Sequence, residues 1–578
     1  MTARARTARA MTAGAAPAEW SGLTYGASLA IGLGAAWVTF GAPVLMGTAP
    51  YWDSPHGIVG QSGADMLTSL SAYDVFVRDA WRWPLLQVEG LGGARGTNIA
   101  FADGAPGLAL IGRGIYRLTG ATPVLFGVWV LACFALNALA ATALVRQLGA
   151  RTLAAGATAA LIGVSMPALL ARWGHITLMA QGLIPLVLLA YLRVAAGVRW
   201  AVGLGVMFGL CLLALLTFPY LFFMVSAVAV AGLAQAGLDR TLTRWRAGLC
   251  CVALLGGLVL ALWVLGYLGG DGFADKGFGI YSMNLLSPLV PQVSGIFRGA
   301  RGMVDATGGQ YEGYVYLGAG LLLLSLLAAP ELRQRLPGRV RRHALLSIVL
   351  AGSLALAVSN EVYAGSTHIL SLPMPSFIAP LTGTVRSSGR LAWIALYLGA
   401  ALVVATVARW RWSTPILLAA CLLQWIDAGA LRGLVRQSVA APFATIDRDA
   451  WHAALPLVDR VVIDPPFLCI VTKTNQDALR FAAIEIQLKA SQAGVPINSV
   501  YAARTRADCR VPAIEPGTLF VSMWPDGSPP DGAQPDGAHP AMPCARGPLL
   551  TVCHDRLPPA TLAALATTNP LPGAADGS

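Results

Sequence analysis

Residues 123–171 decide the fold, and they read PVLFGVWVLACFALNALAATALVRQLGARTLAAGATAALIGVSMPALLA. It contains two apolar runs, at 123–145 and 154–171, separated by a short turn that carries Arg146 and Arg151. A bilayer core of about 30 Å needs roughly 20 apolar residues for each helix that crosses it. Short loops rich in arginine stay on the cytoplasmic side of a membrane. The stretch therefore predicts two membrane-spanning helices joined by a cytoplasmic turn.

The rest of the chain repeats this pattern. Its 578 residues are 56% hydrophobic and 12% charged, and the mean hydropathy is +0.63. An ordinary soluble protein is about 45–50% apolar and about 25% charged, so a disordered chain, a coiled coil and a simple soluble enzyme are excluded. Nine further apolar runs lie at 25–46, 176–192, 200–217, 219–236, 247–268, 313–330, 344–360, 390–408 and 413–430.

The arginines fix the expected orientation. If the tail at residues 1–24 is cytoplasmic, alternation places every short arginine-rich loop on the same side, as the positive-inside rule requires. The net charge of +12 is spread over these loops, whereas a nucleic-acid site would gather it on one soluble face. We therefore expect membrane lipids, and no nucleic acid, as partners, with the C-terminus on the extracytoplasmic side.

The first outer loop, residues 47–122, holds a short apolar stretch at 104–118, GAPGLALIGRGIYRL. Arg113 stands in its middle, and a centrally placed arginine costs about 2.5–3.5 kcal/mol in a bilayer. We predict an interfacial or re-entrant helix here. The expected fold is a polytopic α-helical membrane domain of about eleven spans at 25–430, with a large first extracytoplasmic loop.

The tail at 431–578 changes character. Strand-like runs at 461–463 and 518–521 flank a helical stretch at 475–492, which predicts a small extracytoplasmic α/β domain. The Pro/Gly/Asp-rich run at 524–543 predicts a disordered loop. Four cysteines in an oxidising compartment favour two disulfides over a zinc site, and the sequence leaves all three pairings open. These are Cys469, Cys509, Cys544 and Cys553.

Polar residues gather in the outer loops, where we look for function. Asp53, Asp65 and Asp103 belong to the acidic first loop. Asp53 follows the first span and Asp103 precedes the short apolar helix, so both are expected near the bilayer surface. A partly desolvated carboxylate there has a raised pKa and is a better general base. The structural alternative is a solvated loop with an interfacial tryptophan belt.

Three further groups stand at outer helix ends. RWGHITLMAQ contains Arg172 and His175, and QYEGYVYLGAG contains Tyr311 and Glu312. In VRSSGRLAWIALYL, Arg386 and Arg390 are four residues apart, a spacing that places both on one face of a helix. Two guanidinium groups at a helix start suit a phosphate or pyrophosphate. The alternative is a pair of arginines that reach lipid headgroups.

The sequence resembles the GT-C superfamily of integral-membrane glycosyltransferases, and in particular a poorly characterised bacterial group within it. The similar segments cover most of the chain. They are WRWPL, FADGAPGLALIGRGIYRL, RWGHITLMAQ, GFGIYSMNLLSPLVPQ, YEGYVYLGAG, VRSSGRLAWIALY and, in the tail, PPFLC and INSVYAAR.

This resemblance implies a glycosyltransferase of the bacterial inner membrane that moves a hexose or pentose from a polyprenyl-phosphate donor to a glycan, lipid or protein of the cell envelope. Asp53 and Asp65 would be base candidates, while Asp103 and His175 could assist. A divalent cation such as Mg²⁺ or Mn²⁺ would be held by Asp53, Asp103 and His175. The paired adjacent acids of several superfamily members are absent, because Ser54 follows Asp53.

The resemblance further implies that Arg386 and Arg390 hold the donor phosphate and that Glu312 orients a sugar hydroxyl, with Tyr311, Arg172 and His175 nearby. Three alternatives stay open. They are a transporter or flippase of lipid-linked saccharides, a polymerase or ligase of the same substrates, and a non-catalytic envelope assembly protein.

Overall fold

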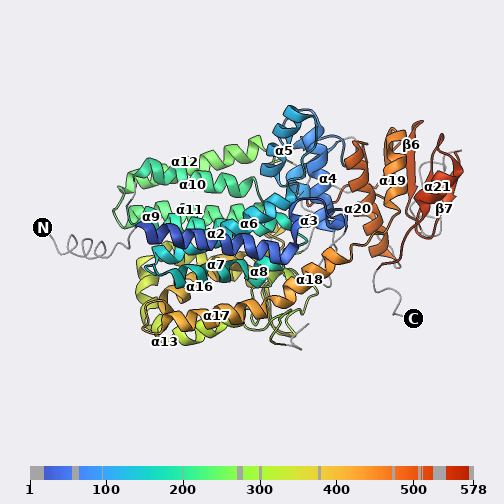
Figure 1. Ribbon diagram of the computed structural model, residues 1–578. Coiled ribbons are helices and arrows are strands. Elements are labelled where there is room, and N and C mark those ends of the chain that lie inside the picture. Colours follow the sequence, from blue (N-terminus) through green and yellow to red (C-terminus); the bar gives the residue numbers. More distant parts are fainter. Residues whose placement is uncertain are drawn as a thin grey trace.

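The computed structural model is mostly helical and describes most of the chain (Figure 1). Nearly all of the predicted disordered loop at 524–543, and most of the predicted tail at 1–24, lie outside the described residues. The structure describes residues 18–54, 64–93, 95–197, 199–269, 277–297, 303–374, 379–470, 475–504, 509–510, 512–524 and 542–571.

Long apolar helices run side by side and form a bundle (Figure 1). Within the described ranges, eight helical segments are long and apolar enough to cross a membrane. These segments indicate a multi-pass membrane protein. They are Gly22–Phe40 (in α2), Phe126–Gln147 (α6), Leu153–Leu170 (α7 and α8), Ile176–Ala195 (η3 and α9), Pro219–Leu238 (α11), Arg244–Val264 (α12), Ser388–Val407 (η6 and α16) and Ser413–Ala440 (α17 and α18).

The other three predicted runs are helical but differ from single straight spans. Helix α10, Trp200–Leu215, has 16 residues. Helices α13, Ala319–Arg342, and α14, Ala344–Val358, meet at a bend of 108°. The described residues thus contain eight candidate spans, or nine if the bent pair counts as one span, whereas about eleven were predicted.

The arginine-rich turns meet at one end of the bundle. The guanidinium of Arg146 lies 5.5 Å from the ring centre of Tyr25, near the start of α2. Arg409, after α16, donates a hydrogen bond of 2.8 Å to the carbonyl oxygen of Leu148. Gln235 at the end of α11 donates to the carbonyl of Arg342. These contacts agree with the prediction that the turns share one side.

The first outer loop lies at the opposite end of the bundle (Figure 1). It contains α4 (Ala64–Arg78), the paired strands β1 (Gln87–Val88) and β2 (Thr97–Asn98), η2 (Ile99–Ala102) and α5 (Pro106–Thr119).

Helix α5 is the predicted short helix, and it is not among the candidate spans. Its Arg113 is 1% exposed. The guanidinium stacks 3.9 Å from the ring centre of Trp81 and donates to the carbonyl of Asp79, so protein groups compensate the buried charge.

The C-terminal region forms a four-stranded sheet in the order β5-β6-β8-β7, and the predicted strand-like runs belong to its neighbouring strands β5 and β6. Strand β5 (Arg460–Asp464) pairs parallel to β6 (Thr518–Ser522), while β8 (Thr551–Cys553) pairs antiparallel to β6 and β7 (Cys544–Arg546). Helices α19 (Arg448–Ala454), α20 (Gln476–Ala493) and α21 (Pro559–Ala566) accompany the sheet. Both predicted disulfides are present, and the pairs are Cys469–Cys509 and Cys544–Cys553.

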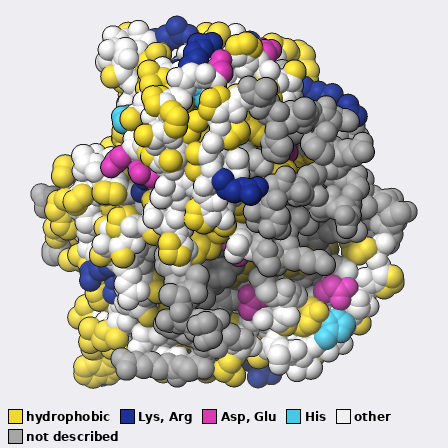
Figure 2. Space-filling model, turned by 90° about the vertical axis from the view of Figure 1, so that its right-hand side faces the viewer, with side chains coloured by type: hydrophobic (Ala, Val, Ile, Leu, Met, Phe, Trp, Pro, Cys, Tyr) yellow, Lys and Arg dark blue, Asp and Glu magenta, His cyan; other side chains and the backbone are white. Residues whose placement is uncertain are grey.

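Helix α20 packs against α4 and joins this region to the bundle. Gln487 donates to Thr68, and Arg78 donates to the carbonyl of Gln492 at 2.7 Å. On the end face in Figure 2, the described Lys and Arg side chains are scattered among acidic and hydrophobic ones.

Candidate functional site

A cavity of about 630 Å³ lies where the bundle meets the C-terminal region. Its wall combines the first outer loop, the starts of α11 and η6, the end of α10, and residues 501–504 of the tail. Helix ends and connecting loops are suited to this role, because they carry polar side chains that the apolar helix interiors cannot accommodate. The volume falls within the range of about 300–1,000 Å³ that is usual for ligand pockets.

Two carboxylates and one imidazole form a cluster on one side of this cavity. Asp65 is in the first turn of α4, and Asp103 follows η2 in a left-handed conformation that aspartate tolerates. His175 precedes η3. Its Nδ1 lies 3.4 Å from Asp65 Oδ2, and its Nε2 lies 3.2 Å from Asp103 Oδ2. The imidazole therefore lies between the two acids.

The opposite charges of the imidazole and the two carboxylates stabilise each other. Burial opposes the charged imidazole, but Asp103 and Asp65 raise the pKa of His175 to about 9. Burial would raise the pKa of Asp65, but the neighbouring His175 holds it below its ordinary value. An imidazolium between two carboxylates is the expected state near neutral pH.

The same three residues could hold a metal ion. One ligand atom from each lies within 4.8 Å of the others. His175 Nε2 is buried and makes no well-directed hydrogen bond to any described residue, although Asp103 is 3.2 Å away. Carboxylate oxygens and an imidazole nitrogen suit Mn²⁺ or Zn²⁺ better than Mg²⁺, which prefers oxygen ligands. The three candidate metal ligands therefore include Asp65 and not Asp53, which the sequence predicted as a ligand.

A buried ion triad forms a second side of the cavity. Glu312, in the short helix η4 (Gln310–Gly313), accepts hydrogen bonds of 2.8 and 2.7 Å from Nε and Nη2 of Arg390. Arg172 donates to the same carboxylate. Burial opposes its ionisation, but Arg172 and Arg390 hold the pKa of Glu312 far below its usual range. Glu312 therefore favours its ionised form, and its two oxygens orient Arg390.

Two glycines allow this close approach. A Cβ atom on Gly389 would lie 2.4 Å from the Cα atom of Gly313, a distance that no side chain tolerates. The backbones of η4 and η6 can therefore touch, which brings Arg390 to Glu312. The ring of Tyr220 lies 4.8 Å below the same guanidinium.

Arg386 and Arg390 both line the cavity, but the expected helical geometry is wrong. Helix α15 (Ala379–Thr384) ends before Arg386 and η6 (Ser388–Ala392) begins after it, so Arg386 lies in the non-helical connection. Both residues reach the cavity wall from this turn and from the start of η6 rather than from one shared helix face. The turn is held by Tyr220, whose hydroxyl accepts a hydrogen bond of 2.7 Å from the backbone of Ser387.

Asp53 is placed apart from the cluster, and the cavity wall does not include it. Its Oδ2 pairs with Lys489 Nζ at 3.1 Å, and its Oδ1 accepts from Gln492 at 2.9 Å. Both partners belong to α20. Asp53 therefore connects the first outer loop to the C-terminal region, and we do not include it in the proposed chemistry.

Apolar side chains form the third side of the cavity, at the ends of α10, α11 and α12. They include Leu215, Phe222 and Leu262, together with Phe223 and Leu268, which are 37% and 58% exposed. These last two extend the apolar side of the cavity to the surface of the protein.

Residues 29–429 match a family described as "Domain of unknown function (DUF6311)". The chain belongs to this family. No curated protein matches it.

The DUF6311 match contains the acid–histidine cluster and the buried ion triad, while the tail that completes the cavity lies beyond it. Tyr501 is partly buried, and Asp65 contributes most to raising its pKa. Arg504 Nη1 donates to the carbonyl of Tyr267 at 2.8 Å. Sequence reasoning missed Tyr220 and Tyr501, and only the INSVYAAR segment pointed towards the latter.

Proposed function

We propose that this protein is a membrane glycosyltransferase that moves a sugar from a polyprenyl-phosphate donor to an acceptor of the cell envelope, on the extracytoplasmic face of the bacterial inner membrane. One observation carries the proposal. A single cavity combines paired carboxylates, guanidinium groups and an apolar side that includes the exposed Phe223 and Leu268. A lipid-linked sugar phosphate has the three matching parts.

The lipid part would lie against Phe222, Phe223 and Leu268, where the cavity opens to the outer surface of the bundle. This arrangement lets a long hydrocarbon chain remain in the membrane while the headgroup enters a polar cavity. A water-soluble nucleotide sugar has no hydrocarbon chain that would fill such an opening. The sequence also contains no nucleotide-binding fingerprint.

The phosphate part would lie beside Arg386 and Arg390. Arg390 uses Nε and Nη2 for Glu312, and its Nη1 makes no hydrogen bond to a described residue. Glu312 thus fixes the guanidinium plane and leaves one edge for an anion. A fixed guanidinium stabilises the charge that develops on a departing phosphate.

The acid–histidine cluster would supply the base. Asp65 or Asp103 accepts the proton of the acceptor hydroxyl, whose oxygen forms a bond to the anomeric carbon. The bond from that carbon to the phosphate oxygen breaks, and its electron pair leaves with the polyprenyl phosphate. His175 holds both carboxylates at the site. If a divalent cation were held by Asp65, Asp103 and a deprotonated His175, it would replace the imidazolium proton and supply positive charge beside the phosphate.

The test uses purified protein in nanodiscs with a panel of polyprenyl-phosphate hexoses and pentoses. Consumption of a donor is measured by mass spectrometry for the wild type, Asp65→Asn, Asp103→Asn and the control Asp477→Asn. Asp477 is an exposed acid on α20. We expect the first two changes to reduce turnover by at least about 100-fold and the control to leave it unchanged.

A transport assay distinguishes the main alternative. A flippase would still move a fluorescent lipid-linked saccharide across a vesicle membrane after Asp65→Asn or Asp103→Asn. Undiminished movement in these variants, with no donor consumed by the wild type, would contradict the proposal.

A further inference from the structure

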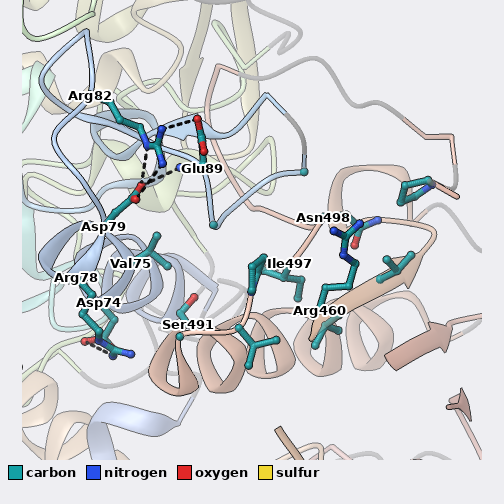
Figure 3. A pocket seen from close by; sticks show the side chains of 18 residues that line it. Asp74, Val75, Arg78, Asp79, Arg82, Glu89, Arg460, Ser491, Ile497 and Asn498 are labelled. Atoms are coloured by element: carbon teal, nitrogen blue, oxygen red, sulfur yellow. Dashed lines mark hydrogen bonds and ion pairs between the residues drawn. The ribbon is translucent and has the colours of Figure 1, made fainter. Parts of the chain in front are cut away.

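A second cavity, of about 600 Å³, lies between α4 and the C-terminal region (Figure 3). One wall carries Asp74, Arg78 and Asp79 from the second half of α4 and the residue after it, with Arg82 and Glu89 from the following loop. The opposite wall is formed by β5, the end of α20 and residues 494–498. Neither the acid–histidine cluster nor the ion triad takes part in it.

The lining of this second cavity has no excess charge. Three carboxylates, from Asp74, Asp79 and Glu89, face three guanidiniums, from Arg78, Arg82 and Arg460. Asp79 accepts two hydrogen bonds from Arg82, which pairs with Glu89 as well. A phosphate or a polycation would meet like charges here. A neutral ligand rich in hydroxyl groups meets both donors and acceptors.

Two polar groups in the cavity have unmet hydrogen-bonding capacity. The hydroxyl of Ser491, in a residue that is 1% exposed, has no hydrogen-bond partner among the described residues. Asp74 is largely buried, and its ion pair with Arg78 is long, at 3.8 Å. Burial is the main cause that raises the pKa of Asp74, to about 6. Buried polar groups in native proteins normally find partners, so a ligand hydroxyl would satisfy both.

Apolar side chains complete the lining, among them Val75, Val461 and Ile497. Mixed walls of this kind suit sugar rings, which present C–H groups on their faces and hydroxyl groups at their edges. Figure 3 shows Val75 and Ile497 on opposite sides, with the charged groups of α4 and the following loop near Val75 and Arg460 beyond Ile497.

The two cavities are neighbours along the chain. Helix α4 contributes Asp65 to the first cavity and Asp74 to the second. Nine residues of helix separate them, which is about 14 Å at 1.5 Å per residue. In the tail, Asn498 lines the second cavity and Tyr501 the first. A short oligosaccharide can cover this distance.

We propose that the second cavity binds an uncharged saccharide segment of the acceptor and directs its terminal hydroxyl towards the first cavity. This inference rests on the proposed function, because it names the class of acceptor that the transferase would use. It identifies that acceptor as a glycan rather than a protein or a simple lipid.

The experiment measures saccharide binding without catalysis. Full-length protein in nanodiscs is titrated with maltotriose, mannotriose and chitotriose, and binding is observed by saturation-transfer-difference NMR. The variants are Ser491→Leu, which fills the cavity, and Asp74→Asn, which keeps its shape. Asp477→Asn, an exposed change on the same helix as Ser491, is the control.

We expect at least one trisaccharide to bind the wild type and the control, and both cavity variants to weaken it at least tenfold. The inference is overturned if none of the three binds, if the cavity variants bind as the wild type does, or if inorganic phosphate displaces the sugar. Because Asp74→Asn is isosteric, it tests the cavity even if Ser491→Leu does not fold.

The two proposals can fail separately. A protein that binds the trisaccharide but transfers no sugar contradicts the transferase alone. A transferase whose KM for its acceptor is unchanged by Asp74→Asn contradicts the acceptor cavity alone.

Discussion

Replacing Glu312 by alanine should destabilise the protein far more than an ordinary loss of an ion pair. Glu312 is the only carboxylate that the described residues offer to both Arg172 and Arg390. The side chains of the three residues are 9%, 1% and 5% exposed, respectively. The change would leave two guanidiniums buried without a counter-charge.

The size of the effect follows from this burial. Exposed ion pairs contribute about 0–1 kcal/mol, whereas the loss of one partner from a buried pair costs about 3–5 kcal/mol. Because Arg390 makes two hydrogen bonds to Glu312 and Arg172 makes another, we expect Glu312→Ala to reach the upper part of that range.

The assay is unfolding in mixed micelles with increasing SDS, followed by tryptophan fluorescence. Glu361→Ala is the matched control, since Glu361 pairs with His368 at 3.0 Å on the partly exposed hairpin of β3 (Glu361–Ala364) and β4 (Thr367–Ser371). We expect the control to lose less than about 1 kcal/mol. Equal losses for the two variants would refute the reasoning about the buried triad.

Three further predictions concern the first cavity and the tail. Arg386→Ala should weaken binding of a polyprenyl-phosphate sugar at least tenfold in a binding assay. Arg333→Ala is the control, because Arg333 is exposed in the distant arginine-rich end of α13, and it should not weaken binding. Equal small effects of the two changes would show that Arg386 is not part of the phosphate site. The pKa of His175 is raised from 6.5 to about 9, so the charged imidazole stabilises the folded protein by about 3 kcal/mol. This stabilisation is complete below about pH 6.5 and is lost as the pH rises through 9. Unfolding measured with EDTA between pH 6 and 10 should show this loss in the wild type and not in His175→Gln; parallel curves would contradict it. Alkylation of protein from the native membrane should find no free thiol among Cys469, Cys509, Cys544 and Cys553, and four modified thiols would exclude both disulfides.

The helices and the polar end of the bundle could be predicted from the sequence because both depend on local composition. A bilayer requires apolar runs of fixed length, so each predicted run is helical. The bend between α13 and α14 depends on how these helices pack. His343, at their junction, contacts Tyr191 of α9, and no local pattern reports such a contact.

The cluster could be predicted only in part. Asp65, Asp103 and His175 were identified as polar residues in outer loops, and the structure brings them together. The position of Asp53 after the first span predicts a catalytic role, but it does not show where the side chain points, and the Asp53 carboxylate pairs with Lys489. Arg386 and Arg390 share a cavity through a turn held by Tyr220. Contacts between residues hundreds of positions apart, such as Tyr501 near Asp65, leave no trace in a single sequence.

The most direct test of the central claim compares the lipid-linked sugars and envelope glycans of a deletion strain with those of its parent. If the first cavity transfers a sugar from a polyprenyl phosphate, the deletion strain lacks one envelope sugar and accumulates its lipid-linked donor. The wild-type gene and Asp477→Asn restore the sugar, while Asp65→Asn and Asp103→Asn do not. Unchanged glycans in the deletion strain, or full restoration by both cluster variants, would contradict the account.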